Sequence, residues 1–254
     1  MGWRAVHGCV RGRGHDRDGV GCDDRSAMAS FDPFVAIALA DGLGSARVGG
    51  LAARWAVEAA LAALEMHPRP LRIDAIARRS LEAARDAVLA LARELEVDER
   101  ECGTTLMLAI ARERQVAVAH VGDGVVVARA AAGWHVLSTP LGGEHANETR
   151  VLAAADALEH ARILVRDNLS ACALLTDGAA ASLWERSTGR VAPALERMTR
   201  ALRTMEPADV EQALRGRLCA QLRERTLDDC GVALLARPEL DLMPHSEAPS
   251  PASR

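Results

Sequence analysis

The stretch Phe34-Val35-Ala36-Ile37-Ala38-Leu39-Ala40-Asp41-Gly42 is an almost wholly apolar run that ends in an acidic residue. A short apolar run of this length is typical of a buried β-strand. An Asp-Gly pair often forms a hairpin turn, but a helix-favouring segment follows this one, so a hairpin explains it poorly. We therefore expect Asp41 to lie at the end of a buried strand, at the edge of a sheet.

Three further apolar runs are joined to acidic residues. They are 116–121, which runs through Gly122 into Asp123-Gly124; 171–175, which runs through Thr176 into Asp177-Gly178; and 231–236, which follows Asp228-Asp229. A hairpin turn suits Asp123-Gly124 best, because strand-like runs flank it on both sides. If the strands lie side by side, their ends bring several carboxylates to one edge, where mutual repulsion raises their pKa values. Such an oxygen-rich cluster suits Mg²⁺ or Mn²⁺, and two adjacent ions form a clamp used in phosphate-ester hydrolysis.

The order of elements predicts one α+β domain over residues 1–238. We expect strands at 34–40, 104–111, 116–121, 125–130 with a continuation at 133–137, 171–175 and 231–236, and helices at 48–66, 73–95, 191–205 and 208–223. The short connector 112–115 predicts an antiparallel meander. The Pro- and Ser-rich segment 239–254 is aperiodic, and we expect a disordered tail there.

Composition excludes several classes of function. The 31 basic residues are all Arg, so chemistry that needs a Lys, such as a Schiff base or a P-loop, is excluded. A net charge of −4 argues against a nucleic-acid partner. The start of the chain lacks the apolar segment of a signal peptide, and no apolar run reaches the roughly 18 residues of a membrane span, so we expect a cytoplasmic protein without membrane contact. The six cysteines lack metal-site spacing, and we expect reduced, mostly buried thiols.

Eight segments, in order between residues 14 and 236, resemble the metal-dependent Ser/Thr protein phosphatases of type 2C, particularly a bacterial branch. They are Gly14-His15 through Cys22-Asp23-Asp24, 40–46, 103–106, 119–124, Gly133-Trp134 with 137–140, 144–149, 174–178, and Asp228-Asp229 with the strand that follows. The resemblance implies a four-layer α/β/β/α sandwich with two central antiparallel sheets. It also implies a binuclear Mn²⁺ or Mg²⁺ centre at one edge of that sandwich.

The resemblance assigns roles at the centre. Asp41 matches the residue that bridges both metals, and Gly42 the residue whose carbonyl is a ligand. Asp177 and Asp228 match the other two principal carboxylates, and Asp24 the residue that supports the metal waters. These four aspartates are the expected catalytic residues. Asp123 matches a residue that joins Asp177 at a third, weaker metal site.

Other residues are expected around the metal ligands, and the chain departs from the family there. Many members hold the substrate phosphate with an Arg shortly before the first Asp; here Gly19, Val20 and Gly21 stand in that region, and Arg17 or Arg13 are the candidates. Position 43 is Leu, where eukaryotic members carry a His that acts as general acid. We expect support for the site from Asp23, His15, Asp229 and Asn147. His120, inside a predicted strand, is expected to be structural.

The leading hypothesis is therefore a hydrolase that removes phosphate from phosphoserine and phosphothreonine of proteins in bacterial signalling, by metal-activated water. The resemblance implies a phosphorylated protein substrate and a cognate Ser/Thr kinase as partners. Two alternatives remain open at this point. One is a catalytically weak or inactive regulatory module that binds phosphoproteins on the same fold, and the other is a phosphatase of a small phosphorylated molecule.

Overall fold

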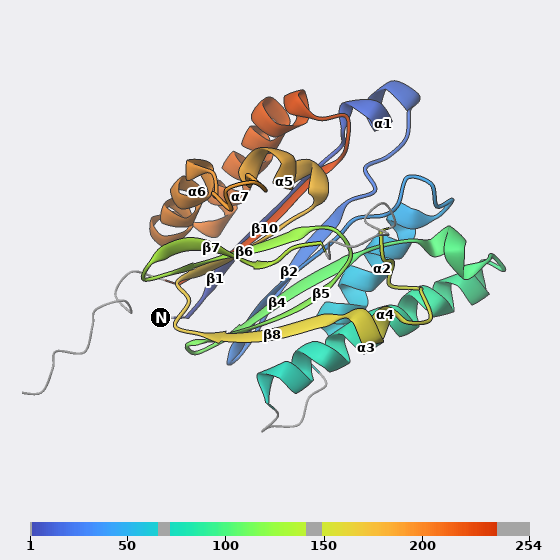
Figure 1. The fold of residues 1–254 in the computed structure, drawn as a ribbon, viewed down its shortest axis with the longest axis horizontal. Coiled ribbons are helices and arrows are strands. Elements are labelled where there is room, and N and C mark those ends of the chain that lie inside the picture. The colour runs from blue at the N-terminus through green and yellow to red at the C-terminus, as the bar shows by residue number, and fades with distance from the viewer. Residues whose placement is uncertain (1, 66–71, 141–148, 238–254) are drawn as a thin grey trace, which may run out of the picture.

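The computed structural model, which describes residues 2–65, 72–140 and 149–237, consists of two five-stranded antiparallel sheets packed face to face (Figure 1). Helices cover the outer face of each sheet, so the molecule has four layers. This arrangement confirms the expected α/β/β/α sandwich. The tail expected at 239–254 lies outside the described residues.

The first sheet has the strand order β1-β10-β9-β6-β7. Its strands are β1 (Arg4–Val10), β6 (Val125–Ala130), β7 (Gly133–Ser138), β9 (Ala171–Leu175) and β10 (Cys230–Ala236). Its outer face packs against α5 (Asp177–Leu183), α6 (Pro193–Thr204) and α7 (Pro207–Arg217). A π-helical segment (Leu218–Leu222) and a 3₁₀ turn (Arg223–Arg225) continue from α7.

The second sheet has the strand order β2-β3-β4-β5-β8. Its strands are β2 (Arg25–Phe31), β3 (Phe34–Ala40), β4 (Leu106–Arg112), β5 (Gln115–Val121) and β8 (Arg162–Asp167). Helices α2 (Gly49–Ala62) and α3 (Ile73–Glu94) cover its outer face. The short helices α1 (Arg13–Asp18) and α4 (Ala157–His160) and the 3₁₀ helix η1 (Glu99–Cys102) lie in the connections.

Alternating side chains of the central strands divide between two apolar layers. In β3, Ile37 and Leu39 belong to the layer between the sheets, whereas Ala36, Ala38 and Ala40 belong to the layer under α2 and α3. Both layers are dry, which explains why the strand reads as a continuous apolar run. Within the described residues, no helix is both long and apolar enough to span a bilayer.

The connection from β5 to β6 corrects one expectation. The hairpins β4–β5 and β6–β7 form as the meander requires, but β5 and β6 lie in different sheets. Asp123-Gly124 is therefore a crossing between sheets and not a hairpin turn. A Cβ at Gly124 would lie 2.7 Å from the Met107 sulfur, and Gly122 has a φ of +120°. The crossing therefore requires glycine at both positions.

Several elements were not expected from the sequence. Strands β1, β2 and β8 and the short helix α1 all form. β1 and β2 are missed because polar or small residues interrupt them, and β1 is held by its register with β10. Two helices are shorter than expected: α2 ends at Ala62 rather than 66, and α7 ends at Arg217 rather than 223.

Candidate metal centre

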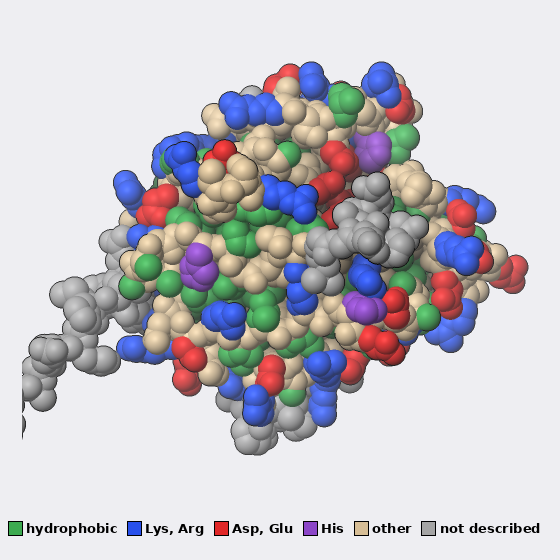
Figure 2. Space-filling model, in the orientation of Figure 1, with side chains coloured by type: hydrophobic (Ala, Val, Ile, Leu, Met, Phe, Trp, Pro, Cys, Tyr) green, Lys and Arg blue, Asp and Glu red, His purple; other side chains and the backbone are tan. Residues whose placement is uncertain are grey.

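Five aspartates meet at one edge of the sandwich because neighbouring antiparallel strands end and begin there. Asp24 precedes β2 and Asp41 follows the paired strand β3. Asp177 follows β9 and Asp228 precedes the paired strand β10. Asp123 lies in the crossing from β5 to β6, so it reaches the same edge from both sheets. Figure 2 shows acidic side chains gathered in a hollow of the surface.

Burial is graded across the cluster. Asp24 is only 1% exposed, Asp41 and Asp123 are half-buried, and Asp177 and Asp228 are exposed at the rim. The cluster therefore has a dry floor and an open mouth, where a ligand from solvent can arrive.

Thr176 joins the two sheets directly beneath the cluster. Its hydroxyl donates a hydrogen bond to Asp24 Oδ2 at 2.8 Å and accepts one from the Gly231 amide at 2.8 Å. The other carboxylate oxygen of Asp24, Oδ1, is buried and has no hydrogen-bond partner. A buried, unpaired carboxylate oxygen is costly unless a cation or water satisfies it.

The segment 103–105 fixes the backbone of Asp41. The Thr105 hydroxyl accepts a hydrogen bond from the Asp41 amide at 3.0 Å, and the Thr105 amide donates to the Asp41 carbonyl at 2.9 Å. The Thr104 hydroxyl donates to the same carbonyl at 2.9 Å. Gly42 passes so close to α2 that a Cβ would lie 2.4 Å from the Gly49 carbonyl carbon. The side chain of Asp41 is thus aimed by a rigid support.

Burial and mutual repulsion raise the pKa values of the clustered carboxyls. Burial, followed by the charges of Asp24, Asp177 and other aspartates, raises the pKa of Asp41 to about 10. Burial and the charge of Asp228 raise the pKa of Asp177 to about 6, although a hydrogen bond with Asp41 acts in the other direction. Burial also raises the pKa of Asp24 and of Asp228. No Arg is among the main influences on these four groups.

This donor set fits hard divalent cations. It consists of carboxylate oxygens with a nearby glycine carbonyl, it has excess negative charge, and it contains one orphaned buried oxygen. Among the described residues, no three His, Cys, Asp or Glu side chains are yet gathered as closely as a bound metal ion requires. Like charges keep such side chains apart, and a cation would draw them together.

Asp229 faces away from its neighbour Asp228 and organises the N-terminal connection. Its buried carboxylate accepts hydrogen bonds from the amides of Gly12 at 2.6 Å and Asp23 at 2.5 Å. Oδ2 also pairs with Nδ1 of His15 at 3.1 Å. The expected supporting residues Asp23, His15 and Asp229 are therefore brought together. Asn147 lies outside the described residues.

The two arginines proposed to hold phosphate are engaged elsewhere. Arg17 Nε donates to the Asp18 carboxylate at 2.8 Å, and its side chain is 73% exposed. Arg13 is exposed and donates to the Thr226 carbonyl at 3.3 Å. Neither arginine contacts the carboxylate cluster in this arrangement.

His120 lies in β5, buried between the sheets. Its Nδ1 is 2.7 Å from the Ser138 hydroxyl and 3.1 Å from an Arg162 nitrogen. Burial and the Arg162 charge lower its pKa to about 3, so the ring is neutral. This agrees with the structural role expected from the sequence.

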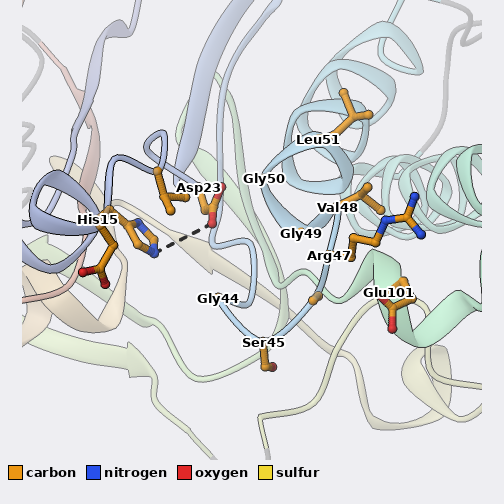
Figure 3. Close-up of a pocket in the computed structure, with 13 residues that line it drawn as sticks. His15, Asp23, Gly44, Ser45, Arg47, Val48, Gly49, Gly50, Leu51 and Glu101 are labelled. Atoms are coloured by element: carbon orange, nitrogen blue, oxygen red, sulfur yellow. Dashed lines mark ion pairs between the residues drawn. The ribbon is translucent and has the colours of Figure 1, made fainter.

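A cavity of about 570 Å³ lies beside Asp23, and none of the five clustered aspartates is among the described residues that line it. His15 and Asp23 form one wall, and the loop and first turn of α2 over residues 44–51, with Glu101, form the other (Figure 3). That loop begins directly after Asp41-Gly42, and the Gly42 amide donates to the Asp23 carbonyl at 3.3 Å, so the two walls of the cavity are joined there.

Comparison with known proteins shows the family. A sequence model for protein phosphatase 2C matches residues 11–219 of the chain. The chain belongs to the protein phosphatase 2C family. This confirms the resemblance drawn from the eight sequence segments.

One curated relative of this protein phosphatase 2C chain comes from Escherichia coli (strain K12). It is Serine/threonine-protein phosphatase 3, which is 28% identical over 166 residues, covering 62% of the chain. The match spans 66% of that relative, just under two thirds of its length.

Several solved structures share the fold of this protein phosphatase 2C chain. Serine/threonine phosphatase Stp1 from Staphylococcus aureus superposes with a TM-score of 0.68 at 14% identity, covering 93% of this chain and 96% of that one. PppA, a regulatory component of T6SS in Pseudomonas aeruginosa, gives 0.66 at 17% identity, covering 93% and 98%. The catalytic domain of PstP in complex with two manganese ions gives 0.62 at 17% identity, covering 92% and 98%.

The threonines that support the carboxylates of this protein phosphatase 2C chain received no role from the sequence. Thr104, Thr105 and Thr176 lay inside quoted segments, next to Gly103 or Asp177, but nothing marked their hydroxyls as anchors. The sequence signal that could have indicated this role is a Thr next to an Asp at the end of a predicted strand.

Proposed function

We propose that the chain is a metal-dependent phosphatase of phosphoserine and phosphothreonine in proteins. The observation that carries this is the cluster of strand-end carboxylates with its orphaned buried oxygen, Asp24 Oδ1, in a protein phosphatase 2C fold. The E. coli relative, whose name describes a serine/threonine-protein phosphatase, supports the same activity.

We assign two divalent ions to Asp41, the Gly42 carbonyl, Asp177 and Asp228, with Asp24 beneath them. Asp123 and Asp177 are the residues for a third, weaker ion. When bound, the ions lower the pKa of water so that it can attack phosphorus, and they neutralise phosphate charge. We favour Mn²⁺ or Mg²⁺, because all these donors are oxygens, and PstP is a neighbour of this fold with two manganese ions.

The chain's own residues supply binding and orientation. Thr176 holds the carboxylate of Asp24, and the segment 103–105 holds the backbone of Asp41, so the backbone of the site is in place before a ligand arrives. The open rim at Asp177 and Asp228 gives a phosphorylated side chain access to the cluster. The crossing at Asp123 is tied to residue 149 by a hydrogen bond from Thr149 at 2.6 Å.

We extend the catalytic domain to residues 1–238, since β1 and β10 pair along their full length beyond the matched range. We further propose a cytoplasmic place of action and a cognate kinase that produces the substrate, both by family resemblance. Neither a purely binding module nor a phosphatase of small molecules is favoured, because all principal carboxylates are present and the relatives are protein phosphatases.

The test uses purified chain with Mn²⁺, a phosphoserine peptide and p-nitrophenyl phosphate. We expect hydrolysis of both substrates, abolished by EDTA and reduced at least about 100-fold by Asp41→Asn. The exposed variant Asp86→Asn on α3 is the matched control. Full binding of two Mn²⁺ ions without hydrolysis of either substrate would refute the proposal.

A further inference from the structure

His15 forms part of the cavity wall, next to Asp23. Its ring is 24% exposed, pairs with the buried Asp229 and lines the cavity, where it points toward Asp23 (Figure 3). Nδ1 is 3.1 Å from Asp229 Oδ2, while Nε2 lies on the cavity side, 3.9 Å from Asp23 Oδ2. A Cβ on Gly44 would lie 3.7 Å from Nε2, so this nitrogen faces the glycine loop across the cavity.

Asp229 determines which nitrogen of His15 carries the fixed proton. Its carboxylate already accepts two backbone amides, from Gly12 and Asp23, which stabilises it as an acceptor. Nδ1 must therefore be the donor to Oδ2, which leaves Nε2 to exchange a proton with whatever occupies the cavity. A carboxylate that orients an imidazole in this way is the arrangement found in general acid–base catalysis.

Among the described residues that line this cavity, the other ionisable side chains are the carboxyls of Asp18, Asp23 and Glu101 and the guanidinium of Arg47. The chain has neither Lys nor Tyr, and position 43, which borders the loop, is Leu. His15 is the one histidine among the described residues that lines the cavity. His120 is sealed between the sheets, and His7 pairs with the Ser26 hydroxyl at 2.9 Å.

The charges around His15 suit a proton donor at a phosphoryl-transfer site. Asp23, Asp228 and Asp229 face it from the strand ends, and Asp18 lies on its own helix. Arg47 and Glu101 stand on the opposite side of the cavity. The Asp23 carbonyl accepts a hydrogen bond from the Gly42 amide at 3.3 Å, so the His15 side of the cavity is joined to the segment that carries Asp41.

We propose that His15 is the general acid of the phosphatase, oriented by Asp229; this rests on the proposed function. As water bonds to phosphorus, the bond from phosphorus to the seryl or threonyl oxygen breaks, and its electron pair stays on that oxygen. The Nε2 proton of the imidazolium passes to the departing oxygen, which gives the free hydroxyl. The attacking water gives up one proton, and solvent reprotonates the imidazole, so protons and electrons balance.

The sharpest variant is His15→Asn. Its side-chain amide places an N–H near the position of Nδ1, so the contact with Asp229 is kept while Nε2 is lost. A seryl oxygen needs a proton to leave, whereas p-nitrophenolate leaves without one. We expect kcat for a phosphoserine peptide to fall about 100-fold and kcat for p-nitrophenyl phosphate to change less than about threefold, with Mn²⁺ saturating.

His135→Asn, at an exposed position of β7, is the matched control and should match the parent on both substrates. An equal loss on both substrates, or no loss on the peptide, would overturn the assignment while leaving the proposed function intact. If the parent protein hydrolyses neither substrate, the proposed function fails and the assignment fails with it.

A second measurement does not depend on turnover. In the metal-free protein at high pH, long-range ¹H–¹⁵N spectra of ¹⁵N-histidine should show His15 with its proton on Nδ1. A proton on Nε2 instead would overturn the orientation by Asp229, and with it the proposal.

Discussion

Asp177→Asn should stabilise the metal-free protein near pH 8. In the folded chain, burial and the charge of Asp228 raise the pKa of this carboxyl from 3.8 to about 6. A folded-state pKa above the unfolded value means that the folded protein binds the extra proton. The group therefore favours folding at low pH, and this contribution is lost as the pH rises from about 4 to about 6.

The magnitude follows from the pKa difference. A difference of about 2 pKa units corresponds to roughly 3 kcal/mol at about 1.4 kcal/mol per unit. Asp177 is exposed at the rim, so solvent screens part of the repulsion, and we take about half of this value, roughly 1.5 kcal/mol. For a chain of this size, that corresponds to an increase in Tm of roughly 3–6 °C.

The assay is urea unfolding in EDTA, at pH 8 and at pH 4, with Asp86→Asn as the exposed control. At pH 4 the gain should shrink to roughly a fifth, because the folded state is then almost fully protonated and the unfolded state is already roughly 40% protonated. Saturating Mn²⁺ should reverse the order, since the parent gains about 2.7 kcal/mol at a hundredfold excess over Kd and the variant loses a ligand. A variant that is no more stable than the parent at pH 8 in EDTA, or equally stabilised at pH 4, would refute the reasoning.

Three other substitutions test the supports of the site. Thr176→Val removes the hydroxyl that donates to Asp24 and lowers its pKa. Calorimetry should then show weaker Mn²⁺ binding, and the free energy of unfolding should fall by about 1–3 kcal/mol. Thr176→Ser should keep both the Mn²⁺ binding and the stability. Gly42→Ala forces a Cβ into the Gly49 backbone and should lower the free energy of unfolding by about 1–3 kcal/mol. Unchanged stability would contradict this close packing. Asp229→Asn sets an NH₂ group against a backbone N–H, so hydrogen exchange over residues 12–24 should accelerate; unchanged protection there would show that Asp229 is not the anchor.

The sequence was most informative where burial is complete. Strands β3, β5, β9 and β10 are apolar runs bounded by acidic residues, and those boundaries placed Asp41, Asp177 and Asp228 at strand ends. Which strands share a sheet could not be predicted in the same way, because a strand buried on both faces has no alternation to show its partner. The Asp123-Gly124 pair illustrates this: the same dipeptide serves a hairpin or a crossing, and only the separation of β5 from β6 decides.

Contacts between distant residues were also invisible. His15 and Asp229 are 214 positions apart, and no local spacing indicates that they pair. For the arginines, closeness in sequence suggested a contact with the cluster that the structure does not show. Arg17 stands close to the cluster in sequence, but its neighbour Asp18 offers a nearer carboxylate, and α1 directs both side chains to the surface.

Asp228 and Asp229 have different roles, so one short segment contributes both to the proposed metal centre and to the N-terminal connection. The two neighbouring side chains have different surroundings: Asp228 stays at the exposed rim, while Asp229 is buried and accepts hydrogen bonds from the amides of Gly12 and Asp23. Because Asp229 also orients His15, folding of the α1 connection and placement of the acid depend on one carboxylate. The proposed centre, which needs cations at one aspartate and hydrogen-bond donors at the next, can therefore be built from the single dipeptide that precedes β10.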